Sequence, residues 1–182
     1  MTKTTRNLVI SMALSVAPVG IPATEANAST AAPAAVAPTH VRTHSPELAS
    51  VIRQAAERST TFRSLVDAIE ASDGIVYVEP GDCGRGVRAC LVTVTAAGPA
   101  RILQVRVDPR KADWDLMGSI GHELRHVVEV LGSPAVTSTA AMFFFYEREG
   151  RRVSHGFETD GAVRAGNRVR AEVRRADAAQ AQ

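Results

Sequence analysis

The sequence predicts one α+β domain over residues 45–177, in which two helices precede a small three-stranded antiparallel sheet and three helices follow it. Three observations support this fold class. Apolar residues recur every three or four positions before residue 74, change to a period near two between residues 75 and 107, and return to the helical spacing after residue 113. About 130 residues are enough for one domain with one hydrophobic core.

The first 28 residues have the three parts of an export signal. Lys3 and Arg6 precede an apolar segment at 8–17, and small residues at 26–28 predict cleavage after Ala28. The alternative is a membrane anchor, which needs about 20 apolar residues, and this segment is shorter. We therefore expect a secreted or periplasmic protein without a stable membrane anchor.

Two regions are expected to be disordered, a leader at 29–44 and a tail at 178–182. The leader is mainly Ala, Pro, Thr and Ser, which cannot bury enough apolar surface to fold. The formal net charge of the chain is +2, so global charge identifies no partner. Arginines crowd the C-terminal region among acidic residues, which is typical of a solvated helix face; binding to nucleic acid or to a membrane surface is the alternative.

The two helices before the sheet have recognisable starts and stops. Ser45 is a capping residue and Pro46 occupies the first helical turn. A second helix is expected at 61–71, and Gly74 follows it as a stop signal. Both segments carry an apolar stripe, so one face of each helix is expected to point inward.

Three strands are predicted after these helices, at 75–78, 89–95 and 101–107. The last two are joined by a turn at 96–99. Polar side chains at Arg101 and Arg106 predict that the third strand is a partly exposed edge of the sheet. An exposed edge is able to hold an extended peptide by β-addition.

Cys83 and Cys90 are the only cysteines. In an exported protein such a pair favours a disulfide, which here would close a glycine-rich turn. A metal site that uses both thiolates is the alternative, and no histidine nearby supports it.

The most informative motif is His122-Glu123-x-x-His126. Residues four apart share one face of a helix, so two imidazoles can bind one Zn²⁺ while the adjacent carboxylate takes a proton from a metal-bound water. Asp113 is a suitable N-cap and Gly132 a suitable stop for this helix. The apolar residues lie on the opposite flank from the histidines: Ile120, Leu124, Val127 and Leu131.

A catalytic zinc site takes three protein ligands and leaves one position to water. Glu129 shares the histidine face but lies about 10 Å along the helix from His122, so it is expected to support the site or to be solvated. The other candidates are Glu147, His155, Glu158 and Asp160. We favour Glu158, because in a predicted helix at 157–175 it begins the inward face, where an unpaired carboxylate is costly. A capping role at the helix start is the alternative.

A further helix is expected at 136–149, and it contains the aromatic run at 142–146. A core helix is the simpler interpretation. The functional alternative is that some of these rings line an apolar pocket beside the metal.

The motif, the order of strands then helix, and the later glutamate together resemble the gluzincin type of zincin-fold metallopeptidase, with the small minigluzincins closest in size. The resemblance implies a zincin-like fold, Zn²⁺ bound by His122, His126 and Glu158, and peptide-bond hydrolysis with Glu123 as general base. The chain differs from the family pattern at Arg125, where an uncharged residue is usual, and at Ala162, where many members carry an aspartate.

The predicted function is therefore that of an exported zinc metallopeptidase acting on peptides or proteins. Tyr146 and His155 are candidate donors to the oxyanion. A second class is a non-catalytic exported zinc-binding protein, in which the same metal is structural or serves a partner; four protein ligands would favour it. The oligomeric state is not predicted.

Overall fold

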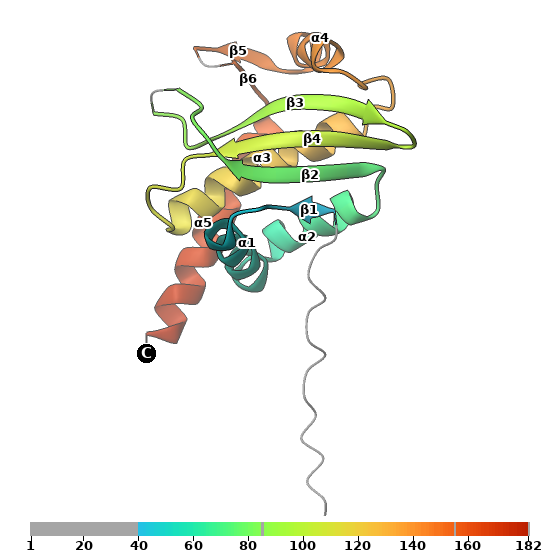
Figure 1. Cartoon of the computed structure of the whole chain (residues 1–182). Coiled ribbons are helices and arrows are strands. Elements are labelled where there is room, and N and C mark those ends of the chain that lie inside the picture. Colours follow the sequence, from blue (N-terminus) through green and yellow to red (C-terminus); the bar gives the residue numbers. More distant parts are fainter. Residues whose placement is uncertain (1–39, 85, 155, 182) are drawn as a thin grey trace, which may run out of the picture. The chain divides into compact units, whose positions relative to one another are not determined.

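The computed structural model describes residues 40–84, 86–154 and 156–181, and these form an α+β fold with helices packed on a mixed sheet (Figure 1). The predicted signal segment 1–28 and most of the predicted leader lie outside the described residues. None of the described helices is both long and apolar enough to cross a membrane. In chain order the elements are β1 (Val41–Arg42), α1 (Pro46–Arg58), α2 (Thr60–Glu70), β2 (Gly74–Pro80), β3 (Ala89–Ala97), β4 (Ala100–Val107), α3 (Trp114–Leu131), α4 (Thr139–Glu149), β5 (Arg151–Val153), β6 (Gly156–Glu158) and α5 (Asp160–Gln180).

The main sheet has four strands in the order β1-β2-β4-β3, so the prediction of three antiparallel strands was wrong. β1 and β4 both pair with β2 in parallel, and only the β3–β4 hairpin is antiparallel. β4 lies between β2 and its own hairpin partner β3, which leaves β3 at the edge of the sheet. β5 and β6 form a separate two-stranded antiparallel hairpin.

The boundaries of the folded part differ from the prediction at both ends. β1 lies within the stretch 29–44 that was expected to be a leader, and its two residues are held by parallel pairing with Val76 and Tyr77. α5 continues to Gln180, into the expected tail. A two-residue strand carries no periodic signal, so the sequence alone does not indicate it.

The strand expected at the edge is central, and Arg101 explains the difference. Its side chain is only 6% exposed. The guanidinium makes a bidentate pair with Asp73, at 2.7 and 2.8 Å, and donates to carbonyl oxygens at the end of α3, including those of Val130 and Leu131. Arg101 therefore satisfies the unpaired carbonyls of a helix C-terminus from inside the fold, a role that strand periodicity cannot reveal.

Helices α1, α2 and α3 pack against the sheet, and α5 packs on α3 and α2. α4 and the β5–β6 hairpin lie beyond β3, at the edge of the sheet (Figure 1). The largest fully buried side chains come from α1, α2, α3 and the three longer strands, and they include Leu48, Phe62, Ile69, Leu103, Leu116, Ile120 and Leu124.

Glycines allow α3 and α5 to approach closely. A Cβ at Gly121 would lie 2.8 Å from Val169 Cγ2, and one at Gly166 would lie 3.0 Å from both the Gly118 carbonyl oxygen and His122 Cβ. Neither position has room for a methyl group. The two glycines therefore allow the first part of α5 to lie against the part of α3 that carries the histidines.

Candidate metal centre

Helix α3 places the motif at the boundary between core and cleft. Asp113 caps its first turn by accepting the Leu116 N–H at 2.9 Å. The predicted apolar stripe is buried, which confirms which flank of the helix packs. His126 and Glu123 are also largely buried, at 5% and 8% exposure.

The structure brings His122, His126 and Glu158 together. Ligand atoms of the three residues all lie within 4.8 Å of one another. Glu158 Oε1 is 2.9 Å from His122 Nε2 and 3.7 Å from His126 Nε2. Two imidazoles and one carboxylate at this spacing can hold a metal ion.

Glu158 reaches the histidines from a strand, and the prediction that it begins the last helix was wrong. It belongs to β6, where it pairs with Arg151. The helix begins later because Thr159 caps α5 by accepting the Ala162 N–H at 3.0 Å. The predicted helix at 136–149 also begins later, at Thr139, where Ser138 is the capping residue.

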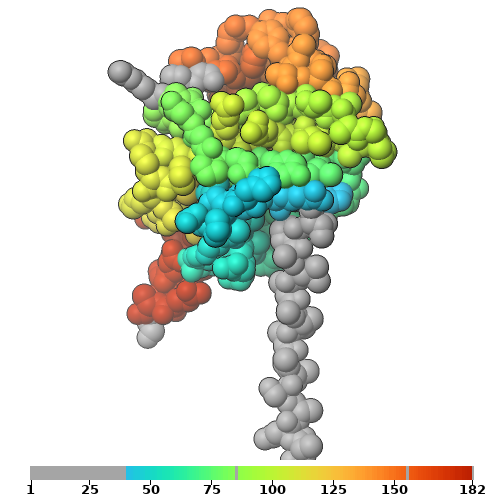
Figure 2. Space-filling view, viewed as in Figure 1, coloured from blue at the N-terminus to red at the C-terminus, as the bar shows by residue number. Residues whose placement is uncertain are grey.

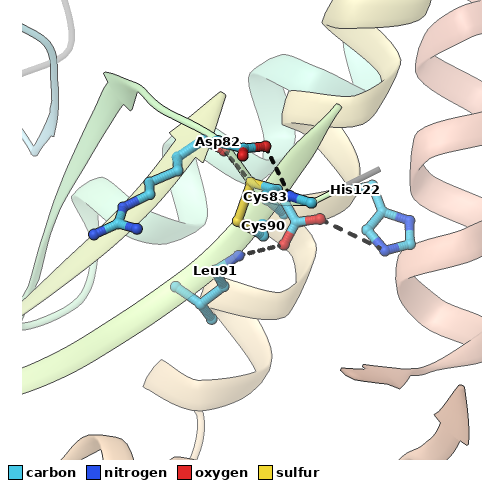
Figure 3. The surroundings of a disulfide bond; sticks show 8 residues. Asp82, Cys83, Cys90, Leu91 and His122 are labelled. Carbon is cyan, nitrogen blue, oxygen red and sulfur yellow. Dashed lines mark hydrogen bonds and ion pairs between the residues drawn. A yellow bond between two sulfur atoms is a disulfide. The ribbon is translucent and has the colours of Figure 1, made fainter. Parts of the chain in front are cut away.

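Glu123 lies beside this group and is fixed by the edge strand. Its Oε2 accepts the backbone N–H of Leu91 at 2.8 Å, and its Oε1 is 3.9 Å from His122 Nε2 (Figure 3 labels Leu91 and His122). Burial raises the pKa of the Glu123 carboxyl against the opposing effect of the two histidines. One carboxylate oxygen is therefore held by β3, and the other faces the cluster.

Glu129 supports the site from one turn along α3. Its Oε2 lies 3.1 Å from His126 Nδ1, on the side of the ring away from Glu158. Thr159 Oγ1 donates to both oxygens of Glu129, at 2.9 and 3.1 Å, and Arg125 Nε donates to Oε1 at 3.2 Å. The sequence left open whether Glu129 supports the site or is solvated, and it did not indicate Thr159 as a partner, because Thr159 is remote in the chain.

The charges in the group are strongly coupled. Burial alone would lower the pKa of His126, but hydrogen bonds with Glu129 and Glu158 raise it to about 9. The hydrogen bond with His126 lowers the pKa of the Glu158 carboxyl. Without a metal ion, a proton on His126 therefore neutralises part of the acidic charge around it.

Tyr146 is buried against His126. Its hydroxyl donates to the His126 carbonyl oxygen at 2.8 Å, and the two rings meet edge to face with centroids 5.1 Å apart. Burial raises the pKa of the phenol. The hydroxyl proton is thus engaged with the main chain of α3. His155, the other candidate oxyanion donor, lies outside the described residues.

A cleft of about 950 Å³ opens in front of the cluster, between β3, α3, α4 and the β5–β6 hairpin. Met142, Phe143, Tyr146 and Phe157 contribute an apolar wall, while Arg88, Asp115, Ser119 and Arg170 contribute a polar one. The residues of the run at 142–146 in α4 differ in exposure. Met142 and Tyr146 are buried, whereas the side chains of Phe143 and Phe144 are 43% and 63% exposed. Figure 2 shows this orange segment at one end of the molecular surface.

Cys83 and Cys90 form the predicted disulfide (Figure 3). The bond ties the glycine-rich turn to the beginning of β3, next to Leu91. It therefore restrains the strand whose backbone holds Glu123. The alternative of a metal site built on these two thiolates does not apply to the bonded sulfurs.

No protein-family model, curated protein or solved structure matches this chain.

Proposed function

We propose that this protein is a zinc-dependent peptidase of the zincin type, with His122, His126 and Glu158 as metal ligands and Glu123 as general base. The observation that carries the proposal is the convergence of three donors from two distant segments, with a buried carboxylate beside them and a cleft in front. This constellation is what metal-assisted hydrolysis requires.

The donor set fits zinc. Imidazole nitrogens and a carboxylate oxygen are ordinary ligands of Zn²⁺, and His₂Glu is a known catalytic set. Among the residues that the structure describes, the group has three members. Three protein ligands would leave one coordination position to water, as a catalytic zinc site requires.

Zinc bound here would supply Lewis acidity and lower the pKa of a bound water to about 7. Glu123 is placed to accept a proton at Oε1, because Oε2 is held by the Leu91 N–H. Its raised pKa brings it closer to the operating pH, as a general base requires. Glu123 can afterwards return that proton to the leaving amine.

Two further residues hold this arrangement in place. Glu129 fixes the ring orientation of His126, which determines which nitrogen faces the cluster. Tyr146 ties its hydroxyl to the backbone of α3, so we assign it to positioning that helix.

Substrate would lie along β3 rather than along β4. The strand at 101–107 was expected to receive the peptide, but it lies between β2 and β3. β3 is the edge that faces the cleft, and its residues 89–92 contribute to the lining. Addition of an extended peptide to β3 would set the cleaved bond in front of Glu123.

The test is hydrolysis by zinc-loaded wild type beside Glu123→Gln, using a mixture of short peptides with products identified by mass. We expect the variant to keep its zinc and to lose at least 100-fold in rate, because the amide cannot accept a proton. Glu149→Gln, an exposed change on α4, serves as the control. Undiminished hydrolysis in Glu123→Gln would refute the assigned role, and zinc binding without hydrolysis in the wild type would favour a non-catalytic zinc protein.

A further inference from the structure

The outer edge of β3 is closed at one end by the chain itself. The N–H of Val94 donates to Thr139 Oγ1 at 3.3 Å, and that hydroxyl lies 3.4 Å from the Val94 carbonyl oxygen. Beyond it, Thr95 bridges to Ser138, and the Ala96 N–H donates to the Thr137 carbonyl oxygen at 3.1 Å. A peptide added to this edge therefore cannot continue its pairing past Val94.

The reacting position lies close to that closed end. Leu91 is the residue of β3 whose N–H holds Glu123. Three positions separate it from Val94, and an extended chain advances about 3.3 Å per residue. Only about two substrate residues fit between the cleaved bond and the closed end.

The opposite end of the cleft is cationic. Arg170 Nε donates to Asp115 at 2.8 Å, and Arg88 Nη1 lies 3.5 Å from the same carboxylate and 3.7 Å from Asp113. Lys111 pairs with Asp113 at 3.2 Å. Asp108, which pairs with Arg110, also lies near Arg88. Four cations thus share three carboxylates, which leaves one positive charge. Arg88 Nη2 donates to the Lys111 carbonyl oxygen at 2.7 Å. Within the described part of the chain, the buried Arg88 Nε has no hydrogen-bond partner, so this one donor of the arginine is unsatisfied.

The separation between this end and the metal centre suits a short segment of peptide. Asp115, Ser119 and His122 share a face of α3, and Asp115 and His122, seven positions apart, are separated by about 10 Å along the helix. Two or three extended residues cover that distance. β3 and α3 run in the same direction, since Arg88 contacts the start of α3 and Leu91 contacts Glu123 farther along.

We propose that the cleft binds short peptides by their carboxyl-terminal end, with the terminal carboxylate at Arg88 and Arg170. Antiparallel addition to β3 directs the C-terminal part of the substrate toward Arg88 and its N-terminal part toward Val94. The inference rests on the proposed function and specifies its substrates: few residues before the cleaved bond and a chain end two or three residues after it.

Binding to the zinc-loaded Glu123→Gln protein tests the carboxylate directly by calorimetry. A tetrapeptide acid is expected to bind at least about tenfold more tightly than its amide, because a charge-assisted hydrogen bond is lost in the amide. Arg88→Gln should abolish the difference, and Arg170→Gln should reduce it. Arg106→Gln, an exposed change on β4, should preserve it. Zinc content checks that each variant is folded.

Three results would overturn the inference. The first is equal affinity of acid and amide in the zinc-loaded protein. The second is full recovery of affinity by an amide that carries a glutamate as its last residue, since the site would then read a side chain. The third is efficient cleavage in the middle of a long unfolded chain, which would contradict the inference and support the proposed function. Failure of the wild type to cleave any peptide would contradict the proposed function, and the binding comparison would still decide the inference.

Discussion

At the scale of single residues, Glu129 joins Arg125, His126 and Thr159 into one hydrogen-bonded group. Arg125 introduces a charge into the motif, and the structure gives that charge a partner four residues away in Glu129. The same carboxylate lies at His126 Nδ1 and accepts from Thr159. Glu129 therefore connects the motif, from within α3, to the residue that caps α5.

Glu129→Gln is expected to weaken zinc binding by about 10- to 100-fold while the protein stays folded, because the orienting charge is lost but the shape is retained. Competition with a coloured chelator measures the affinity. Glu149→Gln on α4 is the control. An affinity for zinc that is unchanged in Glu129→Gln would contradict the supporting role.

The pKa of His126 sets a dependence on pH for the metal-free protein. Its folded pKa of about 9 lies above its ordinary value of 6.5. The contribution of this group to the free energy of unfolding is therefore fully present below pH 6.5 and is lost as the pH rises through 9. Urea unfolding between pH 6 and 10 should show this loss without zinc and not with zinc. Stability of the metal-free protein that is constant over this range, or a pKa of His126 near 6.5 by NMR, would contradict it.

At the scale of elements, the sequence predicted which segments are helices and strands better than it predicted their neighbours. The apolar stripe of α3 follows from spacing alone, and so does the helical nature of α1 and α2. The central position of β4 does not, because strand order depends on contacts between distant segments. The position of Glu158 in a strand was missed for a local reason. Thr159 is the N-cap of α5, so the helix begins at Asp160, after Glu158.

Arg101 is expected to be the most sensitive polar residue of the sheet. Arg101→Met should lower the free energy of unfolding by roughly 3 kcal/mol or more, because it leaves the carbonyl oxygens at the end of α3 and one carboxylate without their partner. Arg106→Met on the same strand is exposed and should have little effect. Denaturant titration compares the two variants. Equal stability of the two variants would contradict the role of Arg101 at the end of α3.

At the scale of the whole molecule, the site depends on the fold. The motif itself could be found in the sequence because both histidines and Glu123 lie within one helical turn. Three contacts of the site could not be found in the sequence, because each joins segments 30 or more residues apart. They are the contact of Glu158 in β6 with His122, that of Glu123 with the backbone of β3, and that of Arg170 with Asp115. The disulfide restrains the start of β3, and the close packing of α3 on α5 fixes these two helices beside each other. Together they hold the segments that line the cleft.

The most direct measurement is the zinc content of the purified protein beside that of Glu158→Ala, after reconstitution and dialysis. We expect about one zinc per wild-type chain and a loss of most of it in the variant, because two histidines alone hold the ion weakly. Zinc retained in full by Glu158→Ala would move the third ligand elsewhere. Absence of zinc from both proteins would contradict the metal centre, and with it the proposed peptidase.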